Sequence, residues 1–262
     1  MILNQVKSVV LSRVLVLSIA LGGLACTPKR SAQVSEAPRW MTEKDNVRIE
    51  IVRTLLEGGD SYRSLELIKV LRLEGVDKPE LDLLQGTALR MQGMVEDAER
   101  LYKRAAENMP KNSEVQRALC VLYADTGEHS KALDACQMAT ELDPKDAAAW
   151  NNYGFLLLTS NQPAEAKDAL QHAVDIDATS GRYRNNLAFA QAANGNHRTA
   201  LRTFLTTGTP ADAHYNVGTA FEREGDTKMA IVYYEKALKY DPNHIHADEA
   251  LQRLLSTTPK EQ

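Results

Sequence analysis

Residues 147–180, AAAWNNYGFLLLTSNQPAEAKDALQHAVDIDATS, hold the pattern that decides the fold. Gly154 is the eighth residue of this stretch, Ala166 is the twentieth, and Asn161 separates the two runs. A small residue on each of two helices lets their backbones pack closely, and asparagine tolerates the left-handed conformation in which helices commonly end. The stretch therefore predicts two antiparallel helices joined by a short turn.

The same arrangement repeats with a period of 34 residues from Asp45 onward. The windows are 45–78, 79–112, 113–146, 147–180, 181–210 and 211–244, and the fifth is four residues short. Position 8 is Gly86, Cys120, Gly154, Ala188 and Gly218 in the second to sixth windows, and position 20 is Ser64, Ala98, Ala132, Ala166, Ala200 and Ala230. One such unit is too small to bury its own apolar face, so neighbouring units must stack on one another.

This pattern resembles the tetratricopeptide repeat. The resemblance implies an all-α fold, a right-handed superhelical solenoid of six helix pairs over residues 45–255, in which residues 245–255 form a C-terminal capping helix and residues 256–262 a tail. In this repeat fold the first helices of successive units line a concave groove. Positions 2, 5, 6, 9, 12 and 13 of each unit face that groove.

The first 25 residues form a segment with only two charges, Lys7 and Arg13, and the apolar run VLVLSIALGGLA. Such a segment is typical of a bacterial signal peptide and is too short to span a membrane. Residues 26–44 contain proline, serine and mixed charges with little apolar periodicity, which predicts a flexible tether.

The signal peptide ends in GLA and is followed by Cys26, which resembles the lipobox of bacterial lipoproteins, although Gly23 stands where leucine is usual. The resemblance implies that Cys26 is lipidated. Because Thr27 follows it rather than an aspartate, we expect anchoring at the periplasmic face of the outer membrane. An ordinary secreted protein is the alternative.

Charge and motifs argue against several function classes. Without residues 1–25 the chain has 29 Lys plus Arg and 35 Asp plus Glu, a net charge of −6, and no basic run, so we expect no nucleic-acid partner. The sequence contains no GxxxxGK[ST], HExxH or GxSxG motif. His244 and His246, two residues apart, would point to different sides of a helix. We therefore expect no catalytic residue, no metal site, no cofactor and no small-molecule substrate, and hence no enzyme.

Two further cysteines, Cys120 and Cys136, occupy positions 8 and 24 of the third unit. An oxidising periplasm would favour a disulfide between them. With position 8 facing position 20, however, position 24 lies about one turn further along the helix, beyond the roughly 7 Å that a disulfide can span between α-carbons. We expect two buried thiols, and the oxidised pair is the alternative.

The adjacent residues Asn151 and Asn152 each cost up to roughly 0.7 kcal/mol in a helix interior relative to alanine. They occupy groove positions 5 and 6, and the same positions hold amides in the next unit. An amide offers both a donor and an acceptor, which matches a peptide backbone of any sequence. We predict a peptide-binding groove formed by Asn151, Asn152, Phe155, Asn185, Asn186, Phe189, Tyr215, Asn216, Arg223, Arg117 and Arg182. The alternative is that the asparagines only solvate the groove or bond to one another between units.

Position 6 holds an asparagine in each of the last three units, Asn152, Asn186 and Asn216, but not in the first three units. We expect the N-terminal half to meet a partner through a more apolar surface with Leu83, Leu84 and Met91 exposed. Some members of the repeat family hold an acidic C-terminus in a dicarboxylate clamp. Arg117, Asn152 and Arg182 fall at suitable places for it, but Val121 and Asn186 stand where the clamp needs an asparagine and a base.

Export, lipidation and six repeats together resemble the type IV pilus pilotin lipoproteins, and the phrases NNYGFLL (151–157) and PAEAKDAL (163–170) look like the middle repeats of that group. The resemblance implies a peptide-binding scaffold that promotes the localisation and multimerisation of a secretin. The partner would be a secretin subunit or another pilus assembly component. The alternatives are a Tad-type pilus assembly lipoprotein and an envelope adaptor that recruits a periplasmic protease or peptidoglycan hydrolase.

Overall fold

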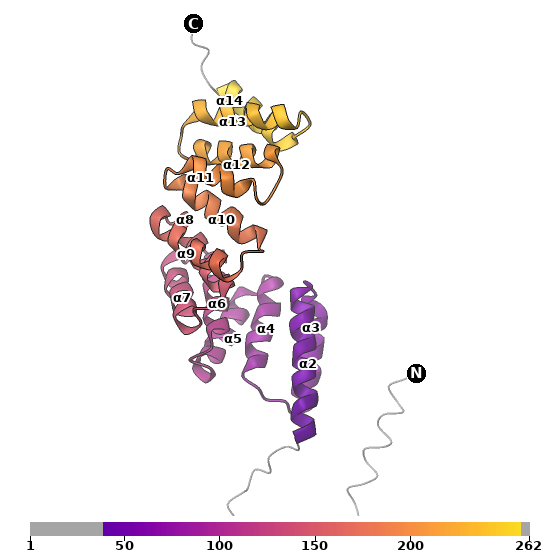
Figure 1. Cartoon of the computed structure of the whole chain (residues 1–262). Coiled ribbons are helices and arrows are strands. Elements are labelled where there is room, and N and C mark those ends of the chain that lie inside the picture. Colours follow the sequence, from indigo (N-terminus) through magenta and orange to yellow (C-terminus); the bar gives the residue numbers. More distant parts are fainter. Residues whose placement is uncertain (1–38, 258–262) are drawn as a thin grey trace, which may run out of the picture. The chain divides into compact units, whose positions relative to one another are not determined.

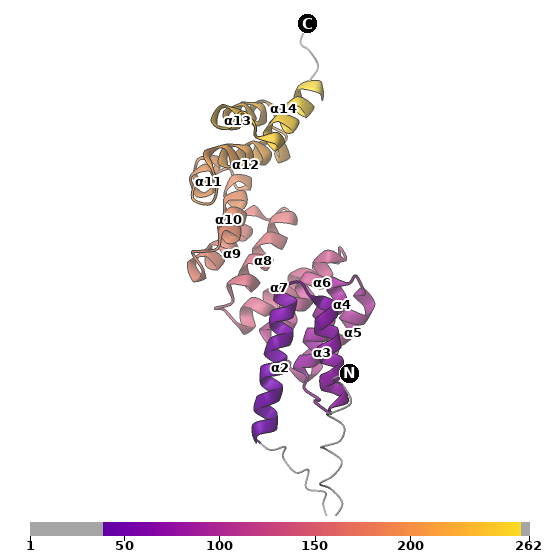
Figure 2. The same cartoon turned by 90° about the vertical axis from the view of Figure 1, so that its right-hand side faces the viewer.

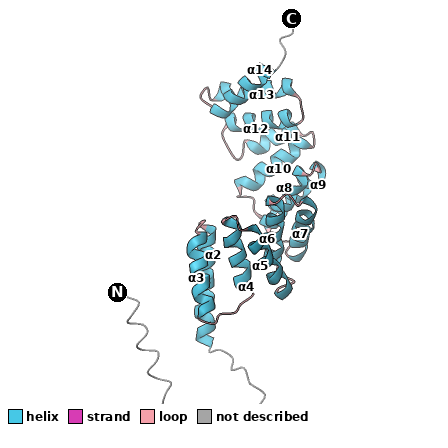
Figure 3. Ribbon diagram, turned by 180° about the vertical axis from the view of Figure 1, so that it is seen from behind, coloured by secondary structure: helices cyan, strands magenta, loops and turns pink. Residues whose placement is uncertain are grey.

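A computed structural model describes residues 39–257 of the chain, and within that range it contains thirteen helices and no strand (Figure 3). The signal peptide, the lipidated Cys26 and most of the tether that we predict lie outside the described residues, as does most of the tail. None of the described helices combines the length and the apolarity needed to cross a membrane.

Helices α2 to α13 follow one another in six pairs, one for each predicted window, and α14 follows them alone (Figure 1). They are α2 (Arg39–Glu57), α3 (Ser61–Leu73), α4 (Glu80–Met91), α5 (Val95–Asn108), α6 (Ser113–Asp125), α7 (His129–Leu142), α8 (Ala147–Thr159), α9 (Pro163–Ile176), α10 (Gly181–Ala193), α11 (His197–Phe204), α12 (Pro210–Arg223), α13 (Thr227–Tyr240) and α14 (Ile245–Thr257). From α4 to α13, each first helix packs most extensively on the second helix of its own unit, and each pair contacts the next (Figure 2). This arrangement confirms the predicted all-α solenoid of helix pairs.

The turn inside each pair contains the left-handed residue that the repeat pattern predicts. The backbone angle φ is 59° at Asn161 and lies between 75° and 81° at the five glycines in the same turn position. Only residues that tolerate positive φ can reverse the chain there, which explains why position 15 is so uniform.

Position 8 faces the side chain at position 24 of its own unit, and this corrects our expectation for the cysteines. A β-carbon added to Gly154 would lie 2.6 Å from Leu170 Cγ, and one added to Gly218 would lie 2.7 Å from the ring of Tyr234. In the third unit the same two positions hold Cys120 and Cys136, whose α-carbons are 4.9 Å apart and whose sulfur atoms form a disulfide. The expected pair of free thiols is therefore wrong, because positions 8 and 24 are direct neighbours rather than a turn apart.

Two helix boundaries differ from the predicted ones. Helix α2 begins at Arg39, so residues 39–44, which we predicted as tether, are helical. Helix α14 ends at Thr257, two residues beyond the predicted cap. The shortened fifth unit has its deletion in α11, which has 8 residues where α13 has 14.

Candidate peptide-binding surface

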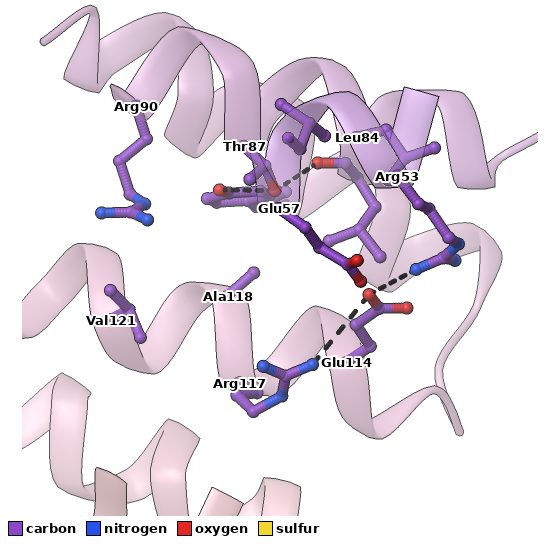
Figure 4. Close-up of a pocket in the computed structure, with 12 residues that line it drawn as sticks. Arg53, Glu57, Leu84, Thr87, Arg90, Glu114, Arg117, Ala118 and Val121 are labelled. Carbon is purple, nitrogen blue, oxygen red and sulfur yellow. Dashed lines mark hydrogen bonds and ion pairs between the residues drawn. The ribbon is translucent and has the colours of Figure 1, made fainter. Parts of the chain in front are cut away.

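The first helices α2, α4 and α6 surround a hollow of about 260 Å³, which we call the charged hollow (Figure 4). Its lining is Arg53, Leu56, Glu57, Leu83, Leu84, Thr87, Arg90, Tyr102, Glu114, Arg117, Ala118 and Val121. All of these except Tyr102 occupy positions 2, 5, 6, 9, 12 or 13 of their units. The hollow therefore lies on the surface that the repeat pattern predicts as the groove.

Ion pairs between units fix the charges in this hollow. Arg53 donates to Glu114 at 2.6 Å and also to Glu80, so it connects the first three units. Burial alone would lower the pKa of Arg53, but the hydrogen bonds to Glu114 and Glu80 raise that pKa above its ordinary value. Figure 4 shows Glu57 reaching toward Glu114 between the two arginines, Arg53 and Arg117.

The other two arginines of the charged hollow also have acidic neighbours. Arg90 Nη1 donates to Asp125 at 2.8 Å, and Arg117 Nε lies 3.0 Å from Asp146. Each arginine of this hollow thus already has a carboxylate of the protein within ion-pair distance.

Our expectation of an exposed apolar surface in the N-terminal half is wrong for two of its three residues. Leu83 and Leu84 are only 1% and 3% exposed, because they pack into two core clusters beneath the hollow. Met91 is 39% exposed, as expected, but it does not line the hollow. The open surface here is charged, and leucines form its floor.

A second hollow of about 490 Å³, which we call the apolar hollow, lies along α8, α10 and α12. Its lining is Phe155, Leu158, Thr159, Asn161, Pro163, Phe189, Ala193, Ala220, Arg223 and Glu224. It brings together Phe155, Phe189 and Arg223, three predicted site residues from three successive units. Phe155 is 51% exposed, and the guanidinium carbon of Arg223 lies 5.4 Å from the centre of the Phe189 ring.

The asparagines behave differently from the prediction. Asn151 is 3% exposed, and its Oδ1 accepts a hydrogen bond of 2.8 Å from Asn186 Nδ2 in the next unit. Asn185 accepts a hydrogen bond from the hydroxyl of Thr207 within its own unit. Asn151 is therefore not available to a ligand, contrary to our expectation, because it is buried and its side-chain amide bonds to Asn186 at the junction between two units. For this residue the alternative that asparagines bond to one another is the correct one.

The remaining predicted residues do not line either hollow, with the exception of Arg117. Asn152 and Asn216 are half-buried. Tyr215 packs against His244, with ring centres 5.1 Å apart. Arg182 is exposed and lies over the ring of its neighbour Tyr183. Of the three residues suggested for a dicarboxylate clamp, Arg117 lines the charged hollow, while Asn152 and Arg182 line neither of the two hollows.

Sequence reasoning missed several residues that do line the hollows, among them Arg53, Glu57, Arg90 and Leu158. A signal for them was present, since all four occupy groove positions 9, 12 or 13. The amides at positions 5 and 6 are only part of the set of groove positions, and positions 9, 12 and 13 supply much of the lining of both hollows. Within the described residues, no group of three or more His, Cys, Asp or Glu side chains could hold a metal ion.

Comparison with known sequences finds the repeat directly. Models of the tetratricopeptide repeat match residues 89–152, 147–180 and 211–244. The chain is 45% identical over 67 residues to a peroxisomal targeting signal receptor of Pichia angusta and 40% identical over 63 residues to the protein CTR9 homolog of Arabidopsis thaliana. Each match covers 24% of this chain but only 12% and 6% of those longer proteins.

Solved structures share the fold at low sequence identity. PilF of Pseudomonas aeruginosa has a TM-score of 0.63 and 14% identity, with 82% of this chain and 100% of that chain covered. YrrB, a protein of the same repeat class with an unusual peptide-binding site, has a TM-score of 0.56 and 21% identity over 70% and 96% of the two chains. MamA has a TM-score of 0.53 and 24% identity over 64% and 93%. The repeat sequence, the paired helices and these likenesses together show that the chain contains tetratricopeptide repeats and folds as a solenoid of that type, a protein-interaction scaffold.

Proposed function

We propose that the protein is a lipid-anchored scaffold at the periplasmic face of the outer membrane that assists type IV pilus biogenesis by promoting secretin localisation and multimerisation. The observation that carries this proposal is the pair of hollows along successive first helices: groove positions supply all of the charged hollow's lining except Tyr102 and six of the ten residues that line the apolar hollow. Together they offer an extended protein segment both charged and apolar contacts.

The sequence of the first 26 residues supports export and anchoring, because a short apolar run precedes Cys26. The disulfide between Cys120 and Cys136 agrees with this, since structural disulfides persist in oxidising compartments such as the periplasm. Acylation at Cys26 with more than one chain would give stable membrane attachment, because each buried methylene contributes about 0.8 kcal/mol.

The pilus link is supported by the resemblance of residues 151–157 and 163–170 to pilotin repeats and by the similarity to PilF over that protein's whole length. The role would be stoichiometric rather than catalytic. The lipid would hold the scaffold at the outer membrane, and the groove would hold a segment of a secretin subunit until subunits associate.

A deletion strain tests the proposal. Heat-resistant secretin multimers should disappear in the deletion strain and return with the wild-type gene. A Cys26→Ala variant should give secretin that is no longer directed to the outer membrane, because the scaffold has lost its anchor. Purification of the tagged protein should recover the secretin.

Three results would contradict the proposal. Normal multimers in the deletion strain would exclude a role in secretin assembly. Recovery of a Tad pilus component would favour the Tad-type lipoprotein, and recovery of a protease or peptidoglycan hydrolase would favour the envelope adaptor.

A further inference from the structure

We propose that the apolar hollow selects an internal segment of the partner in which a large apolar side chain lies next to an aspartate or glutamate. This inference rests on the proposed role of the groove in holding a protein segment. It concerns the residues of the hollow that no repeat pattern assigns to packing, namely Phe155, Phe189 and Arg223.

The apolar part of the preference follows from the lining. Phe155, Leu158 and Phe189 line the hollow, and Ala193 and Ala220 leave space between them. Phe155 is 51% exposed, so binding would remove a large aromatic surface from water. Buried aromatic anchors supply much of the affinity at protein interfaces.

The acidic part of the preference follows from the charges at the edge of this hollow. Glu224 is occupied, because both its carboxylate oxygens lie within 2.9 to 3.0 Å of His197 Nε2. Arg223 is exposed and stacks on Phe189. Among the described residues no carboxylate lies within ion-pair distance of it. A ligand carboxylate can therefore pair with Arg223 without displacing an ion pair of the protein.

The charged hollow provides an internal comparison. Arg53 and Arg90 each donate to a carboxylate, and Arg117 lies beside one. A ligand carboxylate that approached them would have to displace an existing pair. Arg223 requires no such displacement, so the preference for an acid belongs to the apolar hollow.

We assign the acid to a side chain rather than to a chain terminus. The segment that we propose runs along the successive first helices, over both hollows and past Arg223, and a segment that instead ends at Arg223 is tested by the free-carboxylate peptide below. The carboxylate that meets Arg223 is then internal to the segment, next to the residue whose side chain enters the hollow.

Short synthetic peptides test this directly with the purified protein. The probe is acetyl-Gly-Ser-Phe-Glu-Gly-Ser-amide, compared with the same peptide carrying glutamine for glutamate and with acetyl-Gly-Ser-Gly-Ser-Phe bearing a free C-terminal carboxylate. Dissociation constants come from NMR titration. With wild-type protein we expect the glutamate probe to bind about 1.5- to fivefold more tightly than the glutamine probe, the range for an exposed ion pair.

Two variants and a control separate the contributions. Arg223→Gln should abolish the difference between the glutamate and glutamine probes. Arg198→Gln, which removes an exposed arginine that does not line the hollow, should preserve it. Phe155→Ala should weaken both probes by the same factor, and circular dichroism checks that each variant is folded.

The inference is overturned if Arg223→Gln retains the preference for glutamate, or if the peptide with the free carboxylate binds more tightly than the internal glutamate probe. Secretin recovery by the wild-type protein remains a separate readout. If the secretin is recovered while the peptides show no preference, this inference fails and the proposed function stands. If no secretin is recovered, the proposed function itself fails.

Discussion

The hydrogen bond between Asn151 and Asn186 predicts that these two residues stabilise the junction between the fourth and fifth units. Replacing either one with alanine removes a bond of 2.8 Å, worth about 1 kcal/mol net, and gains roughly 0.7 kcal/mol of helix propensity. Asn151→Ala leaves only the half-buried amide of Asn186 without this bond and should change stability by a few tenths of a kcal/mol. Asn186→Ala leaves the oxygen of the buried Asn151 without it and should cost about 1–3 kcal/mol, less the gain in helix propensity. The pairwise term isolates the hydrogen bond, because the propensity gains cancel in a double-mutant cycle.

We expect a coupling energy of about 1 kcal/mol between Asn151→Ala and Asn186→Ala, measured by urea denaturation followed by circular dichroism. The matched control is the cycle of Asn151→Ala with Asn216→Ala, which lies at the same repeat position as Asn186 but one unit further on. The control pair should be additive within about 0.3–0.5 kcal/mol. A coupling for the first pair no larger than that of the control would refute a structural role for these asparagines.

Three further predictions concern packing, the disulfide and acid stability. Gly154→Ala should lower the melting temperature, because a β-carbon 2.6 Å from Leu170 costs about 1–3 kcal/mol against about 1 kcal/mol of helix propensity; an unchanged or higher value would contradict the close packing. Dithiothreitol should destabilise the wild-type protein by about 3 kcal/mol but leave Cys120→Ala/Cys136→Ala unaffected, and an unaffected wild type would mean that no disulfide forms. Burial alone would raise the pKa of Asp82, but hydrogen bonds from Arg104 and Arg72 lower it, so this carboxylate stabilises the fold fully above about pH 4 and loses its contribution as the pH falls through its lowered pKa. Urea midpoints measured from pH 7 to 2 should accordingly converge for wild type and Asp82→Asn, and parallel curves would contradict this.

The fold was predictable because its determinants are local and repeat six times. Gly154 against Leu170 and the left-handed Asn161 are constraints that each unit must satisfy by itself, so their period is visible in the sequence. The start of α2 at Arg39 was not visible, because the first unit has no preceding unit to impose the repeat register.

The site was predictable only in part. Groove positions follow from the register, which is why Phe155, Phe189 and Arg223 meet in one hollow. The repeat register does not predict which polar side chains bond to each other across a unit boundary. Asn151 forms such a bond, with Asn186, and is buried at that boundary. The disulfide was missed because the contact between positions 8 and 24 depends on how far two helices slide along each other, which residue spacing alone does not give.

Site-directed photocrosslinking in living cells tests most directly whether the surface with the two hollows holds a secretin segment. A photoreactive phenylalanine analogue would replace Phe155, which is 51% exposed in the apolar hollow, or Met138, which is 45% exposed on the second helix α7. We predict a crosslink to the secretin from position 155 and none from position 138. Equal crosslinking from both positions, or a crosslink from position 138 alone, would contradict a binding role for this surface.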